Sequence, residues 1–154
     1  MRSEMEELSI ALGFETYPSK HTCEGDNESP SVSVNGLRAP YIAVILDDPD
    51  APGGTYTHWT IWNIKASGTI PEGISPEDRP AELPGAVQGT NSGGSIGYTG
   101  PCPPRGSVHR YYLKVYGLDA PLDLVPGASK KTLEAAMRGH VRQHGEAMAT
   151  YGRR

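Results

Sequence analysis

A single run of sequence, "GYTGPCPPRGSVHRYYLKVYGLD" from Gly97 to Asp119, restricts the fold more than any other feature. Three prolines and two glycines fall within residues 100–106. Because proline fixes φ and donates no backbone hydrogen bond, these residues exclude a helix or a central strand. From His109 onward the run is aromatic and aliphatic with an alternating pattern, which favours a strand. The run therefore predicts a stiff loop that leads directly into a β-strand.

The rest of the chain shares this bias toward turns. It has 19 glycines, 14 prolines and a single phenylalanine among 154 residues, which is too turn-rich for a helical bundle. Val, Ile, Leu, Tyr and Trp are frequent enough to build a core, so general disorder is not expected. We expect one mostly β domain over residues 1–154, the default for a chain of this length.

Charge and hydropathy exclude several functional classes. The net charge is −4 with Lys and Arg scattered along the chain, whereas a nucleic-acid surface needs a strongly basic face. No apolar run approaches the ~18 residues of a membrane span. Residues 1–10 are acidic where a signal peptide would be apolar. We expect a soluble, cytoplasmic protein with no nucleic-acid partner and no membrane span.

Local patterns predict four strands, at residues 31–36, 41–46, 55–64 and 109–118. The second is a continuous apolar run, typical of a central strand buried on both faces, and Asp47, Asp48 and Pro49 end it. A hairpin over residues 49–54 would pair it with the third. Residues 5–12 fit either a short strand or an initial helical turn.

The C-terminal segment has helical spacing. Between residues 65 and 106 the chain is rich in Pro and Gly with hardly any periodicity, and such long connections are usually functional or disordered. After it, Ser129 is a plausible N-cap. One face of a C-terminal helix would then consist of Leu133, Ala136, Met137, His140, Val141, His144 and Met148.

Two stretches carry side chains that could bind a ligand or take part in catalysis. In "DDPDAP", residues 47–52, Asp48 either belongs to a tight turn or holds its carboxylate at the mouth of the sheet, because Pro49 favours an extended conformation before it. His58 in "THWTIWN" either packs half-buried or contacts a ligand. Strand alternation puts His58 on the side of Thr60, Trp62 and Ile64, opposite Trp59 and Ile61.

The strand that begins at His109 presents two different faces. One carries His109, Tyr111, Leu113 and Val115, and the other, which we expect to be solvated, carries Arg110, Tyr112, Lys114 and Tyr116. A histidine and a phenol two positions apart can converge on one small group. Rigid prolines before them would hold the wall of a pocket still.

These motifs resemble a known family. "DPDAP", "HWTIWN" and the run from Gly97 look like the signature regions of the phosphatidylethanolamine-binding protein family, which includes Raf kinase inhibitor proteins and plant flowering regulators. "TCEGDNESPSVSV", residues 22–34, resembles the prokaryotic N-terminal motif. The resemblance spans about residues 16–151. The cysteine in "GPCPP" points to the bacterial and archaeal branch.

The resemblance implies a fold and a site. The fold would be a two-sheet antiparallel sandwich with peripheral helices, one of them C-terminal, and the site a small anion-binding pocket. Gly93 stands where the family often has an aromatic residue, so we expect a wider or more mobile mouth. The pocket residues carried over by motif are Asp48, His58, Pro103, Gly106, His109 and Tyr111, with Asp50, Ala51 and Cys102 near the edge.

The expected function is non-catalytic binding of a phosphate-like anion or phosphorylated group, in a protein that regulates a kinase or protease partner. Imidazoles and a phenol donate hydrogen bonds to such an anion. The alternative is an acid–base enzyme using His58, His109 and Asp48, with Ser107 close by in sequence. The chain has no nucleophile elbow and no HExxH motif. No cofactor or metal is expected.

Two further expectations concern the cysteines and assembly. Cys23 and Cys102 form no CxxC pair, so a zinc site on cysteines alone is not expected. A reducing compartment would keep both as free thiols. The resemblance places Cys102 at the pocket rim, and Cys23 could lie nearby. Because prokaryotic relatives are often dimeric, the resemblance also favours a homodimer, with the helix face packing on the sandwich or on a second subunit.

Overall fold

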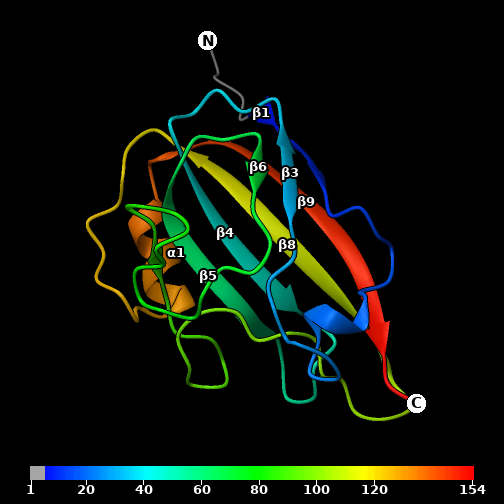
Figure 1. Cartoon of the computed structure of the whole chain (residues 1–154). Helices are drawn as coiled ribbons and strands as arrows, with labels where there is room; N and C mark the ends of the chain where they lie inside the picture. Colours follow the sequence, from blue (N-terminus) through cyan, green and yellow to red (C-terminus); the bar gives the residue numbers. More distant parts are fainter. Residues whose placement is uncertain (1–5) are drawn as a thin grey trace.

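The apolar run predicted as a central strand is β4 (Tyr41–Asp48) in a computed structural model that describes residues 6–154. Every residue from Ile42 to Asp48 is buried. The strand lies between β5 (Tyr56–Lys65) and β8 (Val108–Leu118), antiparallel to both (Figure 1). The central position of this strand and its hairpin to β5 are therefore confirmed.

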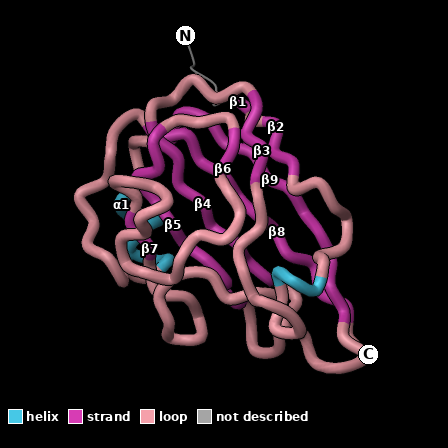
Figure 2. Tube along the Cα trace, viewed as in Figure 1, coloured by secondary structure: helices cyan, strands magenta, loops and turns pink. Residues whose placement is uncertain are grey.

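The strands form two sheets, in agreement with a mostly β fold (Figure 2). The larger has the order β1-β9-β8-β4-β5-β7 and the smaller β2-β3-β6. Pairing is antiparallel except between β1 and β9, which are parallel at one edge. The remaining bounds are β1 Glu6–Glu7, β2 Ser9–Ala11, β3 Val32–Asn35, β6 Thr69–Ile70, β7 Val87–Gln88, β9 Val141–Gly152, and a 3-10 turn at Ser19–His21.

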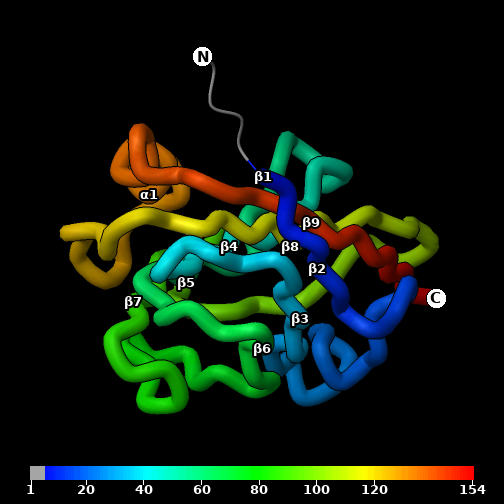
Figure 3. Tube along the Cα trace, turned by 90° about the horizontal axis from the view of Figure 1, so that it is seen from above, coloured from blue at the N-terminus to red at the C-terminus, as the bar shows by residue number. Residues whose placement is uncertain are grey.

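The larger sheet is buried on both faces at its centre, along β4, because a different layer covers each face there (Figure 3). Toward the smaller sheet, Val44 and Leu46 of β4 pack in one cluster with Val32. Toward the helix α1 (Lys130–Met137), Ala43 and Ile45 pack in a second cluster. Alternate residues of β4 thus serve two cores, which explains why its sequence is continuously apolar.

The predicted C-terminal helix is correct only in its first part. Ser129 caps α1 by accepting a hydrogen bond from the Thr132 amide at 3.2 Å, and Leu133 and Met137 are buried. Gly139, with φ +82°, follows the end of the helix. Residues 141–152 then form β9, paired with β8 along its length. The helix is therefore internal to the chain, and the last long element is a strand.

The predicted alternation along β5 is correct from Trp59 to Trp62 but wrong for His58 and Ile64, because β5 contains bulges on either side of that stretch. The register against β4 shifts between Leu46 and Asp47 and again between Ile42 and Val44. The His58 ring consequently lies 5.3 Å from the Tyr111 ring, in the inter-sheet region that Trp59 also occupies. Ile64 lies in the inter-sheet cluster as well, whereas Trp62 faces the helix. Each extra residue in a bulge reverses the side on which the following residues point.

Two other segments complete the comparison with the sequence. The ambiguous residues 5–12 contain the short strands β1 and β2, while residues 1–5, which include part of the acidic N-terminal segment, lie outside the described residues. The connection 65–106 contains only the short strands β6 and β7. Within residues 6–154, no helix is long and apolar enough to cross a membrane.

Candidate functional site

A cavity of about 400 Å³ opens where three strand ends meet. β4 ends at this edge of the sheet, and β5 and β8 begin there because both run antiparallel to β4. The loop 99–104 and the residue after β9 close the remaining side. The cavity is lined by Asp48, Ala51, Pro52, Tyr56, His58, Thr99, Gly100, Cys102, Pro103, Pro104, His109, Tyr111 and Arg153.

Asp48 and His109 form a buried pair at the base of the cavity. Asp48 Oδ2 accepts a hydrogen bond from His109 Nδ1 at 2.7 Å, and Asp48 Oδ1 accepts one from the Asp50 amide at 2.8 Å. The side chains are only 4% and 8% exposed. The two interpretations of this aspartate are therefore both correct, since it makes an Asx-type turn and places its carboxylate at the site. With Nδ1 occupied, Nε2 is the His109 nitrogen left for a ligand.

His58 is held in one orientation by the loop across from it. Its Nδ1 donates to the Thr99 carbonyl at 2.7 Å, which leaves Nε2 as the nitrogen free to meet a ligand. Burial lowers the pKa of His58 below its ordinary value. Without a ligand, the His58 ring is therefore neutral at pH 7.

Tyr111 supplies a hydroxyl without a partner. Its side chain is fully buried, and among residues 6–154 its hydroxyl makes no hydrogen bond. The His58 and His109 rings lie 5.3 Å and 6.3 Å from its ring. Burial raises the pKa of Tyr111 above the usual value for a phenol, so it stays a neutral donor. A buried unpaired donor in a cavity wall is suited to a ligand that accepts a hydrogen bond.

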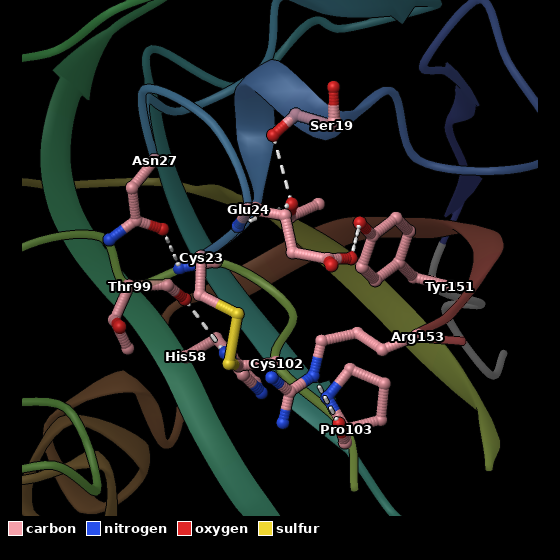
Figure 4. The surroundings of a disulfide bond; sticks show 12 residues. Ser19, Cys23, Glu24, Asn27, His58, Thr99, Cys102, Pro103, Tyr151 and Arg153 are labelled. Atoms are coloured by element: carbon pink, nitrogen blue, oxygen red, sulfur yellow. Dashed lines mark hydrogen bonds between the residues drawn. A yellow bond between two sulfur atoms is a disulfide. The ribbon is translucent and has the colours of Figure 1, made fainter. Parts of the chain in front are cut away.

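The proline-rich loop is fixed by a disulfide, which contradicts the prediction of two free thiols. Cys23 and Cys102 are bonded across 79 residues of sequence (Figure 4), and neither cysteine is free. The Cys23 amide also donates to the Pro101 carbonyl at 3.2 Å, and the Gly100 amide to Asn27 Oδ1 at 2.7 Å. These contacts hold together two loops that are far apart in the sequence. The spacing of the two cysteines along the chain could not predict how close the loops lie in the fold.

Two of the expected pocket residues do not line the cavity. The carboxylate of Asp50 instead accepts hydrogen bonds from the Arg110 guanidinium at 2.8 and 2.9 Å, which hold the pKa of Asp50 well below its usual range. Gly106 has φ +86°, and its amide donates to the Arg153 carbonyl at 2.8 Å. Both residues therefore stabilise segments next to the cavity instead of lining it. The other seven candidates line the cavity.

Arg153 is a site residue that the sequence analysis missed. It follows β9, and its Nε donates to the Pro103 carbonyl at 2.7 Å, so that its guanidinium lies beside Cys102 and His58 (Figure 4). The antiparallel pairing of Val108 with Gly152 brings it there. Because the sequence analysis predicted a helix for the C-terminal segment, it did not place Arg153 at the cavity. The strand would have been detectable from the period-two pattern of polar residues between 142 and 150.

Tyr56 is the second missed residue, and it explains the missing aromatic at Gly93. A Cβ at Gly93 would lie 2.7 Å from the Tyr56 hydroxyl. The Tyr56 ring lies 4.7 Å from the His58 ring and lines the cavity. An aromatic side chain from β5 therefore occupies the rim beside Gly93, where we expected a wider mouth.

A comparison with known protein families agrees with the motifs seen in the sequence. The family model of phosphatidylethanolamine-binding protein matches residues 10–152, nearly the whole chain. The chain belongs to this family. The family assignment made from the motifs is therefore confirmed.

Several relatives cover nearly all of this family member. It is 50% identical to a UPF0098 protein of Pyrococcus horikoshii, over 95% of this chain and 75% of the relative. A UPF0098 protein of Methanothermobacter thermautotrophicus is 48% identical, over 88% and 90%.

Two solved structures share the fold. A phosphatidylethanolamine-binding protein homologue of Chlamydia trachomatis superposes with a TM-score of 0.82 at 33% identity, covering 96% of this chain and 97% of the other. Escherichia coli YbcL, described as a member of the mammalian family, gives 0.85 at 29% identity, covering 96% and 99%.

Proposed function

We propose that this protein binds a phosphate-like anion or a phosphorylated group in the cavity, without catalysis, and thereby regulates a partner protein. The observation that carries the proposal is the unpaired hydroxyl of Tyr111, whose ring lies 5.3 Å and 6.3 Å from two imidazole rings. Arg153 adds a permanent positive charge at the same cavity. The phenol and the guanidinium can donate hydrogen bonds to a tetrahedral oxyanion, and the free imidazole nitrogens can form hydrogen bonds with its oxygens or its proton.

The negative charge of Asp48 does not conflict with an anionic ligand. Its two carboxylate oxygens already accept hydrogen bonds from His109 Nδ1 at 2.7 Å and from the Asp50 amide at 2.8 Å, which offset part of its charge. His58, whose Nδ1 donates to the Thr99 carbonyl, can accept a hydrogen bond from a hydrogen phosphate at Nε2. The site therefore fits a phosphate group that carries one proton.

Calorimetric titration with phenyl phosphate tests the binding. We expect His109→Ala and Tyr111→Phe each to weaken binding by about 1.5–3 kcal/mol, the range for hydrogen bonds to a charged group. Tyr112→Phe is the matched control, because Tyr112 is a half-exposed phenol on the opposite face of the same strand. Equal losses for Tyr111→Phe and Tyr112→Phe, or no binding to the wild-type protein, would contradict the assignment.

Regulation of a partner rests on the same cavity. A phosphorylated side chain of a kinase, or an acidic segment of a protease, would place its anionic group where phenyl phosphate binds. Family membership supports this part of the proposal. Capture from a cell lysate should depend on Arg153, so Arg153→Gln should lose the captured protein and free phenyl phosphate should elute it. Capture that neither change affects would assign the partner to another surface.

The Asp48–His109 pair also favours a second candidate, an acid–base enzyme. A carboxylate bonded to Nδ1 is a common way of orienting a histidine base. Among the lining residues, however, Cys102 is held in the disulfide and Ser107 is absent, so the cavity offers no serine or thiol nucleophile. Hydrolysis of 4-nitrophenyl phosphate that His109→Ala abolishes would favour the enzyme over the binding module.

A further inference from the structure

A second group of chemistry-bearing residues lies outside the anion cavity. His21 ends the 3-10 turn, Glu28 precedes β3, and Glu72 follows β6. One ring nitrogen of His21 and one carboxylate oxygen from each glutamate lie within 4.8 Å of one another. None of the three lines the anion cavity.

The tautomer of His21 is fixed by the backbone. Its Nδ1 donates to the Glu28 carbonyl at 2.8 Å, so the neutral ring has its lone pair on Nε2. That Nε2 lies 3.6 Å from Glu72 Oε1, and among residues 6–154 it makes no hydrogen bond. A ring nitrogen that bonds a backbone carbonyl while the other faces carboxylates is the arrangement found in metal-binding histidines.

The His21 Nε2 lone pair faces a carboxylate, an arrangement suited to a cation between the two atoms. His21 is only 3% exposed. A charge-assisted hydrogen bond would draw the two atoms to about 2.7–2.9 Å, whereas two ligands on a tetrahedral zinc ion lie about 3.3–3.5 Å apart. The observed 3.6 Å is closer to the zinc geometry. We propose that His21, Glu28 and Glu72 form a divalent-metal site, and that zinc is the metal this donor set suits best.

The backbone already holds the three segments together. The Glu28 amide donates to the Lys20 carbonyl at 3.2 Å, and the Gly73 amide to the Ser29 carbonyl at 2.9 Å. Each glutamate is thus next to, or part of, a fixed backbone contact between segments distant in sequence. Zinc would draw the three ligand atoms, which already lie within 4.8 Å of one another, to about 3.3–3.5 Å apart, and a water molecule would supply the fourth ligand.

Lys20 is the competitor for the metal. Its ammonium lies 2.8 Å from Glu72 Oε1, the oxygen that also faces His21, and its side chain is 48% exposed. A zinc ion must displace this ammonium from the carboxylate. Removal of the Lys20 charge should therefore tighten zinc binding, which a purely structural cluster would not do.

The test is calorimetric titration of ZnCl₂ into chelator-treated full-length protein. We expect one zinc per chain, a loss of more than about ten-fold in affinity for both Glu28→Gln and Glu72→Gln, and a gain for Lys20→Gln. Glu77→Gln is the matched control, because Glu77 is an exposed glutamate in the same connection and should bind zinc as the wild type does.

Imidazole NMR identifies the ligand directly. Zinc should shift the Nε2 resonance of His21 and leave those of His58 and His109 unchanged. No zinc binding to the wild-type protein would overturn the proposal. Unchanged affinity in the Glu28→Gln and Glu72→Gln variants would also overturn it, and so would a zinc-dependent shift confined to His58 or His109.

Discussion

At the scale of single residues, the cavity depends on which ring nitrogens already carry a hydrogen bond. Nδ1 of His109 donates a hydrogen bond to Asp48, and Nδ1 of His58 donates one to the Thr99 carbonyl. Both rings are therefore held with Nε2 as the atom available to a ligand. Since burial lowers the pKa of His58, its charge state depends on what enters the cavity.

This arrangement predicts the pH dependence of anion binding. Without a ligand, the pKa of His58 is below its ordinary value of about 6.5, and a bound anion raises it again because the anion favours the charged ring. The protein then takes up a proton on binding. Affinity should rise as the pH falls, starting near the pKa of the bound state and continuing to below 6.5.

Sulfate is the appropriate probe, since its own charge is constant between pH 5.5 and 8.5. We expect the affinity to increase by up to about ten-fold per pH unit for each proton taken up. His58→Gln should reduce that slope, while Tyr112→Phe should leave it unchanged. A profile that is flat from pH 8 to pH 5.5 would show that the imidazoles do not contact the anion.

At the scale of elements, the loop 99–104 is stiff for two separate reasons. Its prolines restrict the backbone, and the disulfide to Cys23 with the Asn27–Gly100 hydrogen bond ties it to a loop near the other end of the chain. Pro103 also accepts a hydrogen bond from Arg153 at 2.7 Å. Proline alone would leave the loop free to swing as a unit, so the long-range ties keep the cavity wall in place.

Removal of the disulfide should affect both stability and the site. A Cys23→Ser, Cys102→Ser double variant should lower the free energy of unfolding by about 2–4 kcal/mol, because the bond closes a long loop in the unfolded chain. Urea denaturation measures this. The same variant should bind phenyl phosphate more weakly, since Cys102 lies in the cavity wall.

Two controls make this result specific. Dithiothreitol should destabilise the wild-type protein and leave the double variant unaffected. Ellman titration of the unfolded wild-type protein without reductant should find no thiols. Two titrated thiols would show that the bond does not form.

At the scale of the whole molecule, the apolar face of α1 is not available to a second subunit. Leu133 and Met137 are buried against the large sheet with Trp62. The sequence left open whether this helix packs on the sandwich or on a second subunit. In the structure it packs on the sandwich. A dimer would have to use another face.

A homodimer remains our expectation, on the basis of the similarity to prokaryotic family members. Light scattering at micromolar concentration should give twice the mass of one chain. A monomeric mass for the wild-type protein would contradict this expectation.

The local sequence determined those features that depend on neighbouring residues. The apolar run at β4 specified a strand covered on both sides, the residues after it specified a turn, and Ser129 specified the start of a helix. Asp48, His58, His109 and Tyr111 stand at or near strand ends. Once the strands pair antiparallel, these four residues reach the same edge, so the family motifs were enough to find them although the alternation predicted at His58 was wrong.

The tertiary structure determined what depends on distant partners. Residues 141–152 fit both a helical spacing and a period-two pattern, and they form a strand because β8 offers them a full ladder of hydrogen bonds. That ladder carries Arg153 to the cavity. The bulges that turn His58 toward Tyr111 exist only in the register with β4. Hydrogen-bond partners and cysteine partners are chosen by proximity in the folded chain, and a one-dimensional pattern reports burial without reporting which segment provides it.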